Sequence, residues 1–210
     1  MPVLSLFVPI IVFGLFLLVS LKKDGLKGLA DRIDAFHDRF GKYVAWLSFI
    51  LLVVQMVVVL ARYLYGAPNI LALPVIMWQE SIIYMHGFLF MLGAAYTLRH
   101  DGHVRVDIFY REAPISRKAM VNLLGALFLL LPMCGTIWAV SWTYVASSWQ
   151  ILEGSRETSG LQAVFLLKTA IPIFAISMAI QGISMILRSL LALKGDADSV
   201  ERLRASGGGH

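Results

Sequence analysis

A few ionisable side chains interrupt long apolar runs. Such side chains are costly to place in apolar surroundings, so they are the first candidates for chemistry. Glu80 and Arg62 each lie near one end of an apolar run, at similar depth if the two runs are antiparallel neighbours. A buried charge is costly unless it is paired, which favours an ion pair. The alternative is that each side chain reaches the aqueous interface separately, as Lys168 can also do from its own run. Both alternatives remain open at this point.

Two further polar residues lie near the middle of apolar runs. His86 could be a proton relay or a haem ligand, but a second histidine would have to face it at the same depth. His100 and His103 lie beyond the run instead. The simpler interpretation is that His86 is a packing residue and that Gln55 makes an interhelical hydrogen bond worth about 1 kcal/mol.

The densest polar segment is the loop that follows residue 98. Arg99, His103 and Arg105 could bind lipid headgroups, and Arg99 and Arg105 are the candidate lipid contacts. Asp101 and Asp107 would neutralise them within the loop. A simple basic loop would not need these acids, so the pattern favours a structural corner or a contact with a partner.

No motif for catalysis or cofactor binding is present. The sequence lacks a GxxxxGK phosphate loop, metal-ligand spacing of Cys and His, and a nucleophile–base pair. We therefore expect no catalytic, cofactor-binding or metal-binding residues, and no enzymatic activity.

Composition indicates which elements position these residues. Apolar residues make up 59% and charged residues 15%, against about 25% charged in soluble domains. This excludes a soluble enzyme, a disordered chain and a nucleic-acid-binding module. A membrane-spanning helix needs about 20 apolar residues. Five runs qualify: 3–21, 44–66, 77–98, 119–146 and 163–187. The predicted fold is an all-α integral membrane protein.

Basic residues predict the orientation of these spans. Of 18 Lys and Arg residues, six lie in 22–43, five in 99–118 and four after Leu187. Basic loops favour the cytoplasm. The N-terminus is therefore expected outside and the C-terminus inside.

In residues 24–43 the apolar side chains recur every three or four residues, as they do in an amphipathic helix. Its apolar side chains are Leu26, Leu29, Ile33, Phe36 and Phe40. Its polar side chains are Asp31, Arg32, Asp34, Asp38 and Arg39. We predict that this helix lies in the membrane interface. The alternative is a soluble capping helix that packs on loops. The tail, 194–210, is polar and ends in what resembles a tag remnant.

An ordered set of motifs resembles the DctQ-like small membrane subunit of tripartite ATP-independent periplasmic (TRAP) transporters. The motifs are Gln55 and Arg62-Tyr63, Trp78 with Glu80, Gly93-Ala94-Ala95-Tyr96, the loop 99–107, Ser159-Gly160, and Leu166, Lys168 and Pro172. The resemblance covers roughly residues 26–193. It places the four-helix domain at 44–193 and leaves 1–23 as an extra N-terminal helix. The outer loop 67–76 is also longer than is usual in the family.

The resemblance implies a scaffold rather than a carrier. Such subunits anchor a larger, DctM-like membrane subunit that holds the substrate and sodium sites, while a periplasmic substrate-binding protein delivers an organic acid. It implies the bacterial inner membrane as location, and lipids but no nucleic acid as further partners. Structural or subunit-interface candidates are Gln55, Arg62, Trp78, Glu80, Arg99, His103, Arg105 and Asp107.

Two alternatives come from other functional classes. A membrane anchor of an electron-transfer complex would hold haem or quinone, and His86 is its only support. A self-sufficient channel or carrier is disfavoured by the absence of internal repeats and by the few charges within the spans.

Overall fold

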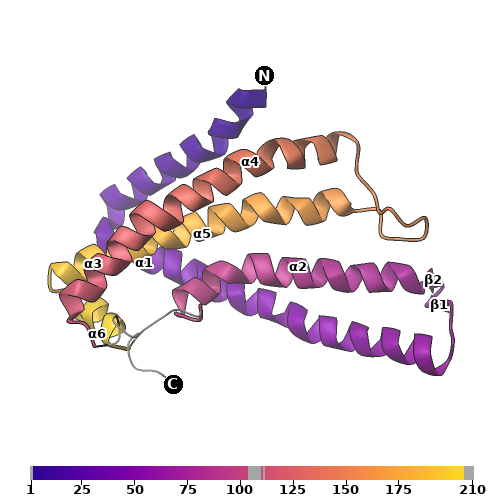
Figure 1. Cartoon of the computed structure of the whole chain (residues 1–210). Coiled ribbons are helices and arrows are strands. Elements are labelled where there is room, and N and C mark those ends of the chain that lie inside the picture. Colours follow the sequence, from indigo (N-terminus) through magenta and orange to yellow (C-terminus); the bar gives the residue numbers. More distant parts are fainter. Residues whose placement is uncertain (1, 104–109, 111, 206–210) are drawn as a thin grey trace. The chain divides into compact units, whose positions relative to one another are not determined.

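Helices form most of the computed structural model (Figure 1), which describes residues 2–103, 110 and 112–205, with side chains from residue 25 onward. The elements are α1 (Pro2–Val59), β1 (Asn69–Ile70), β2 (Leu73–Pro74), α2 (Val75–Arg99), α3 (Ile115–Gly125), α4 (Leu131–Gln150), α5 (Val164–Leu193) and α6 (Ala197–Ala205). A π-helical turn at Leu60–Leu64 extends α1, and another at Ala126–Leu130 joins α3 to α4.

Four helical stretches of the described chain are long and apolar enough to cross a membrane. They are Gly25–Leu64, Val75–Arg99, Ile115–Gln150 and Val164–Leu193. They contain the four predicted spans that follow residue 43, apart from residues 65, 66 and 163 at their ends. The predicted all-α class is therefore confirmed, and these four runs are helices of membrane-spanning length. Pro172 lies inside α5 without ending it, as is common in membrane helices.

The sequence predicts separate elements at 1–23, 24–43 and 44–66, whereas the structure places residues 2–59 in one element, α1, with a break at Gly25. Helix continues on both sides of Gly25, whose φ of 69° lies in the left-handed region that glycine adopts without a steric penalty. Side chains before Gly25 lie outside the described ones, so the fifth span stays a prediction. Residues 26–59 form one unbroken helix. The predicted change of element at residue 43 is therefore absent, and the interfacial position of 24–43 stays a prediction.

The chain divides into two compact units. The first comprises Met1–Asp38, Thr97–Gly135 and Met178–His210, and the second comprises Arg39–Tyr96 and Thr136–Ser177. Helices α1, α2, α4 and α5 each contribute residues to both units. Each unit has its own way of holding its helices together.

In the first unit, α1 packs on the C-terminal half of α5. Leu29, Ala30 and Ile33 form a cluster with Leu187, and each is at most 7% exposed. The spacing of three and four residues along α1 places these side chains on one helical face. The apolar face that the sequence predicts for this segment is thus buried against α5 near Leu29 and Ile33, whereas Phe36 is 55% exposed.

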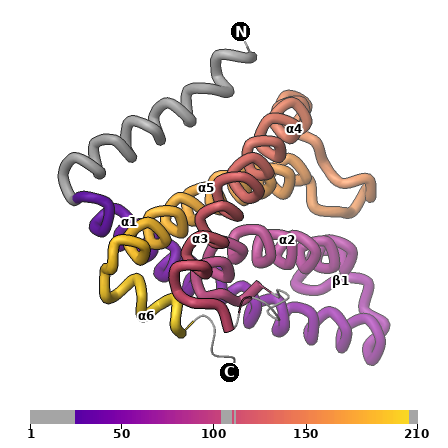
Figure 2. The backbone as a smooth tube through the Cα atoms, turned by 60° about the vertical axis from the view of Figure 1, so that its left-hand side comes forward, coloured from indigo at the N-terminus to yellow at the C-terminus, as the bar shows by residue number. Residues whose placement is uncertain are grey.

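A tight turn then brings α6 back toward α3 (Figure 2). Gly195 has a φ of 87°, its N–H bonds to the carbonyl of Ala192, and the Asp196 N–H bonds to that of Leu191. This pattern of bonds is a Schellman motif, which ends α5. Leu203 of α6 then packs with Ala119 of α3, and this contact ties the C-terminal helix to the unit.

In the second unit, glycines allow helices to approach closely. A Cβ atom on Gly41 of α1 would lie 2.3 Å from the Tyr96 ring of α2. A Cβ on Gly87 of α2 would lie 2.9 Å from a methyl group of Leu167 on α5. Small residues at helix contacts are typical of membrane proteins, in which packing rather than burial from water drives association.

The loop 67–76 contains a short hairpin. Asn69 pairs with Pro74 and Ile70 pairs with Leu73. The two turn residues, Leu71 and Ala72, have φ angles of 49° and 64°, a conformation that costs roughly 1–2 kcal/mol per non-glycine residue.

Candidate functional site

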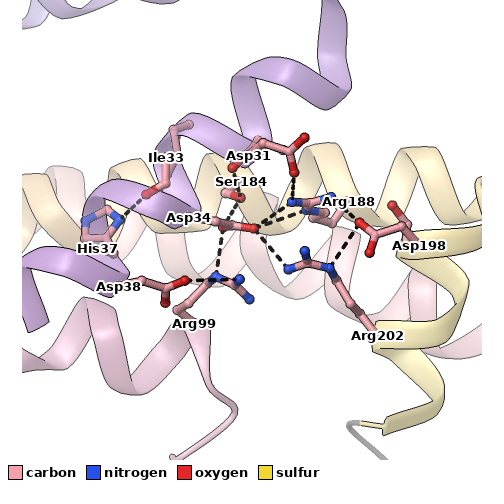
Figure 3. Close-up of polar contacts among 12 residues, drawn as sticks. Asp31, Ile33, Asp34, His37, Asp38, Arg99, Ser184, Arg188, Asp198 and Arg202 are labelled. Atoms are coloured by element: carbon pink, nitrogen blue, oxygen red, sulfur yellow. Dashed lines mark hydrogen bonds and ion pairs between the residues drawn. The ribbon is translucent and has the colours of Figure 1, made fainter. Parts of the chain in front are cut away.

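Asp34 is the centre of a polar cluster in the first unit (Figure 3). Its side chain is 5% exposed. Its Oδ1 atom accepts hydrogen bonds from Ser184 Oγ at 2.6 Å and Gln181 Nε2 at 3.1 Å. Its Oδ2 atom accepts from Arg188 Nη2 at 2.9 Å and Nε at 3.2 Å. The carboxylate thus receives both neutral and charged donors from one face of α5.

Two more arginines lie near the same carboxylate. Arg99, in the last turn of α2, has its Nε atom 3.4 Å from Asp34 Oδ1, and Arg202 of α6 has Nη1 3.5 Å from Oδ2. Three further acids also pair with these arginines. Arg188 also pairs with Asp31 and Asp198, and Arg99 pairs with Asp38. We call the set the Asp34 cluster: Asp31, Asp34, Asp38, Arg99, Gln181, Ser184, Arg188, Asp198 and Arg202.

The Asp34 cluster joins four helices, α1, α2, α5 and α6. Removing one partner from a buried ion pair costs about 3–5 kcal/mol, because it leaves the other charge uncompensated. Here the loss of Asp34 would leave Arg188, which is only 12% exposed, without its most buried acceptor. The cluster therefore fixes how these helices meet.

A smaller ion pair lies at the turn between α5 and α6. Lys27 Nζ donates to Asp196 Oδ1 at 2.9 Å, and Asp196 also accepts a hydrogen bond from the Ser199 N–H as the cap of α6. The Lys27 ammonium and the Ser199 donors lower the pKa of Asp196 from 3.8 to about 2. Asp196 is therefore ionised throughout the neutral and mildly acidic range.

Glu80 is the centre of a second polar site, in the second unit. Its Oε1 atom accepts a hydrogen bond from Ser155 Oγ at 2.5 Å, and its Oε2 atom accepts from the Leu161 N–H at 2.6 Å. One turn later on α2, the Tyr84 hydroxyl donates to the Leu161 carbonyl at 3.3 Å. Glu80 and Tyr84 thus bind the N–H and the carbonyl of Leu161, which lies in the loop 151–163.

Gly160 is required for this arrangement. A Cβ atom there would lie 2.4 Å from Ser155 Oγ and 2.6 Å from a Glu80 carboxylate oxygen. Ser155 Oγ also accepts a hydrogen bond from the Glu157 N–H. We call this site the Glu80 clamp: Glu80, Tyr84, Ser155, Gly160 and Leu161.

Lys168 fixes the first part of the same loop. Its Nζ atom lies 2.5 Å from Glu153 Oε2 and 4.0 Å from the centre of the Tyr144 ring. The Lys168 ammonium lowers the pKa of Glu153 in the loop. The loop between α4 and α5 is therefore held at both of its ends.

The structure does not bring Glu80 and Arg62 together. Glu80 is engaged by the loop, whereas Arg62 lies exposed in the π-helical turn after α1, and no ion pair joins these two described residues. A backbone N–H satisfies the carboxylate in place of the arginine that the sequence suggested.

The other predicted site residues are distributed over both units. Trp78 Nε1 donates to the Ile70 carbonyl of the hairpin at 3.1 Å. Arg99 lies in the Asp34 cluster. Gln55, His86 and His103 are exposed. Arg105 and Asp107 lie outside the described residues.

Sequence reasoning missed Asp34 as a central residue. It placed Asp34 on the polar face of an amphipathic helix, but Asp34 is 4% exposed and His37 is 1% exposed. A signal for this was present, since Ala30, Asp34, His37 and Gly41 recur at spacings of four, three and four, and all are buried. The partner residues Gln181, Ser184 and Arg188 likewise share one face of α5.

This arrangement defines a polytopic α-helical membrane protein in which the Asp34 cluster and the Glu80 clamp join the chain's own helices and loops. The sequence profile of the DctQ component of tripartite ATP-independent periplasmic transporters matches residues 50–192. The chain therefore belongs to the DctQ family, the small permease subunits of TRAP transporters. No curated protein and no solved structure matches the chain.

Proposed function

We propose that this chain is a scaffold that anchors the large, DctM-like subunit of a TRAP transporter in the bacterial inner membrane. In this proposal the large subunit performs sodium-coupled uptake of an organic acid, and a periplasmic binding protein delivers that acid. The basic segments 22–43, 99–118 and 188–204 face the cytoplasm, so the N-terminus lies in the periplasm.

The observation that carries the scaffold role is how the buried charges are used. Asp34 and Arg188 join α1 to α5, and Arg99 and Arg202 bring α2 and α6 to the same carboxylate. A carrier exposes charged groups to its substrate or coupling ion in turn. Charges that are held by ion pairs to neighbouring helices instead favour a rigid support for a moving partner.

Reconstitution with and without this chain tests the proposal. The large subunit, the binding protein and this chain would be purified and placed in vesicles with an imposed sodium gradient. We expect the large subunit to co-purify with this chain, and uptake of the organic acid to be lost when this chain is omitted. Uptake by this chain alone, or a haem absorbance band in the purified chain, would contradict the scaffold role.

A further inference from the structure

The last, apolar part of α1 and the π-helical turn that follows it carry their non-aromatic polar side chains on one stripe. Between Val44 and Leu64, the non-aromatic polar side chains are Ser48, Gln55 and Arg62, spaced seven residues apart. All three are exposed. Leu52 and Val59, 62% and 40% exposed, lie between them on the same side of the helix. We call these five residues the α1 seam: Ser48, Leu52, Gln55, Val59 and Arg62.

The spacing within the seam is typical of a helix–helix contact. Its members follow one another at four, three, four and three residues, which is the pattern of the contact line in a coiled coil. A neighbouring stripe of the same helix, which includes Val44 and Val58, is buried within the chain at 6% and 3% exposure. The described part of the chain thus covers one stripe of α1 and leaves the seam uncovered.

Gln55 cannot be satisfied by lipid. It lies nine residues before Leu64, which is about 13 Å along the helix and near the middle of a hydrocarbon core of about 30 Å. Its amide has no hydrogen-bond partner among the described residues. The acyl chains of lipid offer neither donors nor acceptors. The side chain is also too short to reach the interface, unlike that of Lys or Arg.

We infer that the α1 seam packs against one transmembrane helix of the large subunit. This inference rests on the proposed function and adds the surface through which it acts. The partner helix supplies the hydrogen-bond partner of Gln55 and approaches closely at Ser48, whose hydroxyl already bonds to the Ala45 carbonyl. At the outer end it supplies an acceptor for Arg62.

A second copy of this chain fits the seam less well. Two copies inserted in the same direction and related by a two-fold axis would present identical stripes to each other. That symmetry would place Arg62 beside Arg62, and like charges repel at such a contact. A different helix, with an acceptor at that level, avoids the repulsion.

Photo-crosslinking from the seam tests the inference in membranes that contain this chain and the large subunit. A benzoylphenylalanine would replace Leu52 in the seam. The matched control would replace Ile50, which is 46% exposed and lies on nearly the opposite side of the helix. We expect a crosslink to the large subunit from position 52 that is at least about fivefold stronger than that from position 50, since only the seam faces the partner.

The outcomes separate the inference from the proposed function. If the large subunit co-purifies but crosslinks from position 50 and not from position 52, the seam is wrong and the scaffold role stands. Crosslinks from position 52 only to lipid, or to a second copy of this chain, also overturn the seam. If the unaltered chain does not co-purify with the large subunit, both proposals fail.

Gln55→Leu gives a second measurement. Because Gln55 is exposed and has no hydrogen-bond partner among the described residues, this variant should keep the melting temperature of the isolated chain. It should weaken association with the large subunit about three- to tenfold, the size of a polar contact between membrane helices. Val53→Leu, at an exposed position outside the seam, is the control and should leave association unchanged. Equal association for both variants would overturn the inference.

Discussion

The Asp34 cluster and the Glu80 clamp use a carboxylate in different ways. Asp34 is surrounded by three arginines and joins four helices. Glu80 accepts from a hydroxyl and a peptide N–H, and holds a single loop. The Asp34 cluster stabilises the contact between helices by pairing opposite charges. The Glu80 clamp stabilises the conformation of the loop 151–163 by hydrogen bonds. The comparison shows that an acid in an apolar helix need not have a basic partner.

The largest effect should come from Asp34→Asn. The substitution keeps the size of the side chain but leaves Arg188, and the two other arginines, facing a neutral amide. We expect a loss of about 2–4 kcal/mol in the free energy of unfolding, because Arg188 loses its most buried acceptor but keeps Asp31 and Asp198. Thermal unfolding in detergent, followed by size-exclusion chromatography, measures it.

Asp38→Asn, at a carboxylate that is 31% exposed, is the matched control and should cost less than 1 kcal/mol. Similar losses for both variants would show that burial does not set the strength of the cluster.

The next effect should come from Gly160→Ala in the clamp. The added Cβ atom would overlap Ser155 Oγ and the Glu80 carboxylate, so the loop must move. We expect a loss of about 1–3 kcal/mol, as for other overpacked sites, and faster proteolysis within 151–163. Gly125→Ala is the control, because a Cβ there meets nothing within 4 Å. Unchanged proteolysis of Gly160→Ala would mean that the loop is not held by the clamp.

A smaller effect is expected for Glu80→Gln. The amide oxygen can still accept from the Leu161 N–H, and the NH₂ group can donate to the Ser155 hydroxyl, but the negative charge is lost. Hydrogen bonds to charged groups exceed neutral ones by about 1 kcal/mol, so the free energy of unfolding should fall by about 1–2 kcal/mol. A loss as large as that of Asp34→Asn would remove the distinction between the two sites.

The smallest effect should come from Asp196→Asn. Asparagine still caps α6, but the ion pair with Lys27 is lost. Because the pKa of Asp196 is lowered from 3.8 to about 2, its contribution to stability is complete above about pH 4 and is lost only as the pH falls through 2. The small difference in melting temperature between variant and parent should therefore be equal at pH 5 and pH 8. A difference that disappears at pH 5 would contradict the lowered pKa.

The sequence predicts the spans better than it predicts the polar sites. Apolar runs specify four spans because the length of a run must match the membrane. Glu80 was recognisable as an acid within an apolar run, but its acceptance of a hydrogen bond from the Leu161 N–H, 81 residues away, was not predictable. Backbone donors are present at nearly every residue and have no sequence signature. Asp34 was predicted on the wrong face because its donors on α5 follow about 150 residues later, so local periodicity alone could not show that they meet.

The hairpin between α1 and α2 has a consequence for the order in which the chain assembles. Its turn residues, Leu71 and Ala72, disfavour the left-handed conformation that they adopt, so the turn does not form readily by itself. One of the hydrogen bonds that hold it comes from Trp78, which lies on α2 and leaves the ribosome after the hairpin. We therefore expect the hairpin to close late, once α2 is helical. In that sequence of events α2 acts as the template for the connection that precedes it.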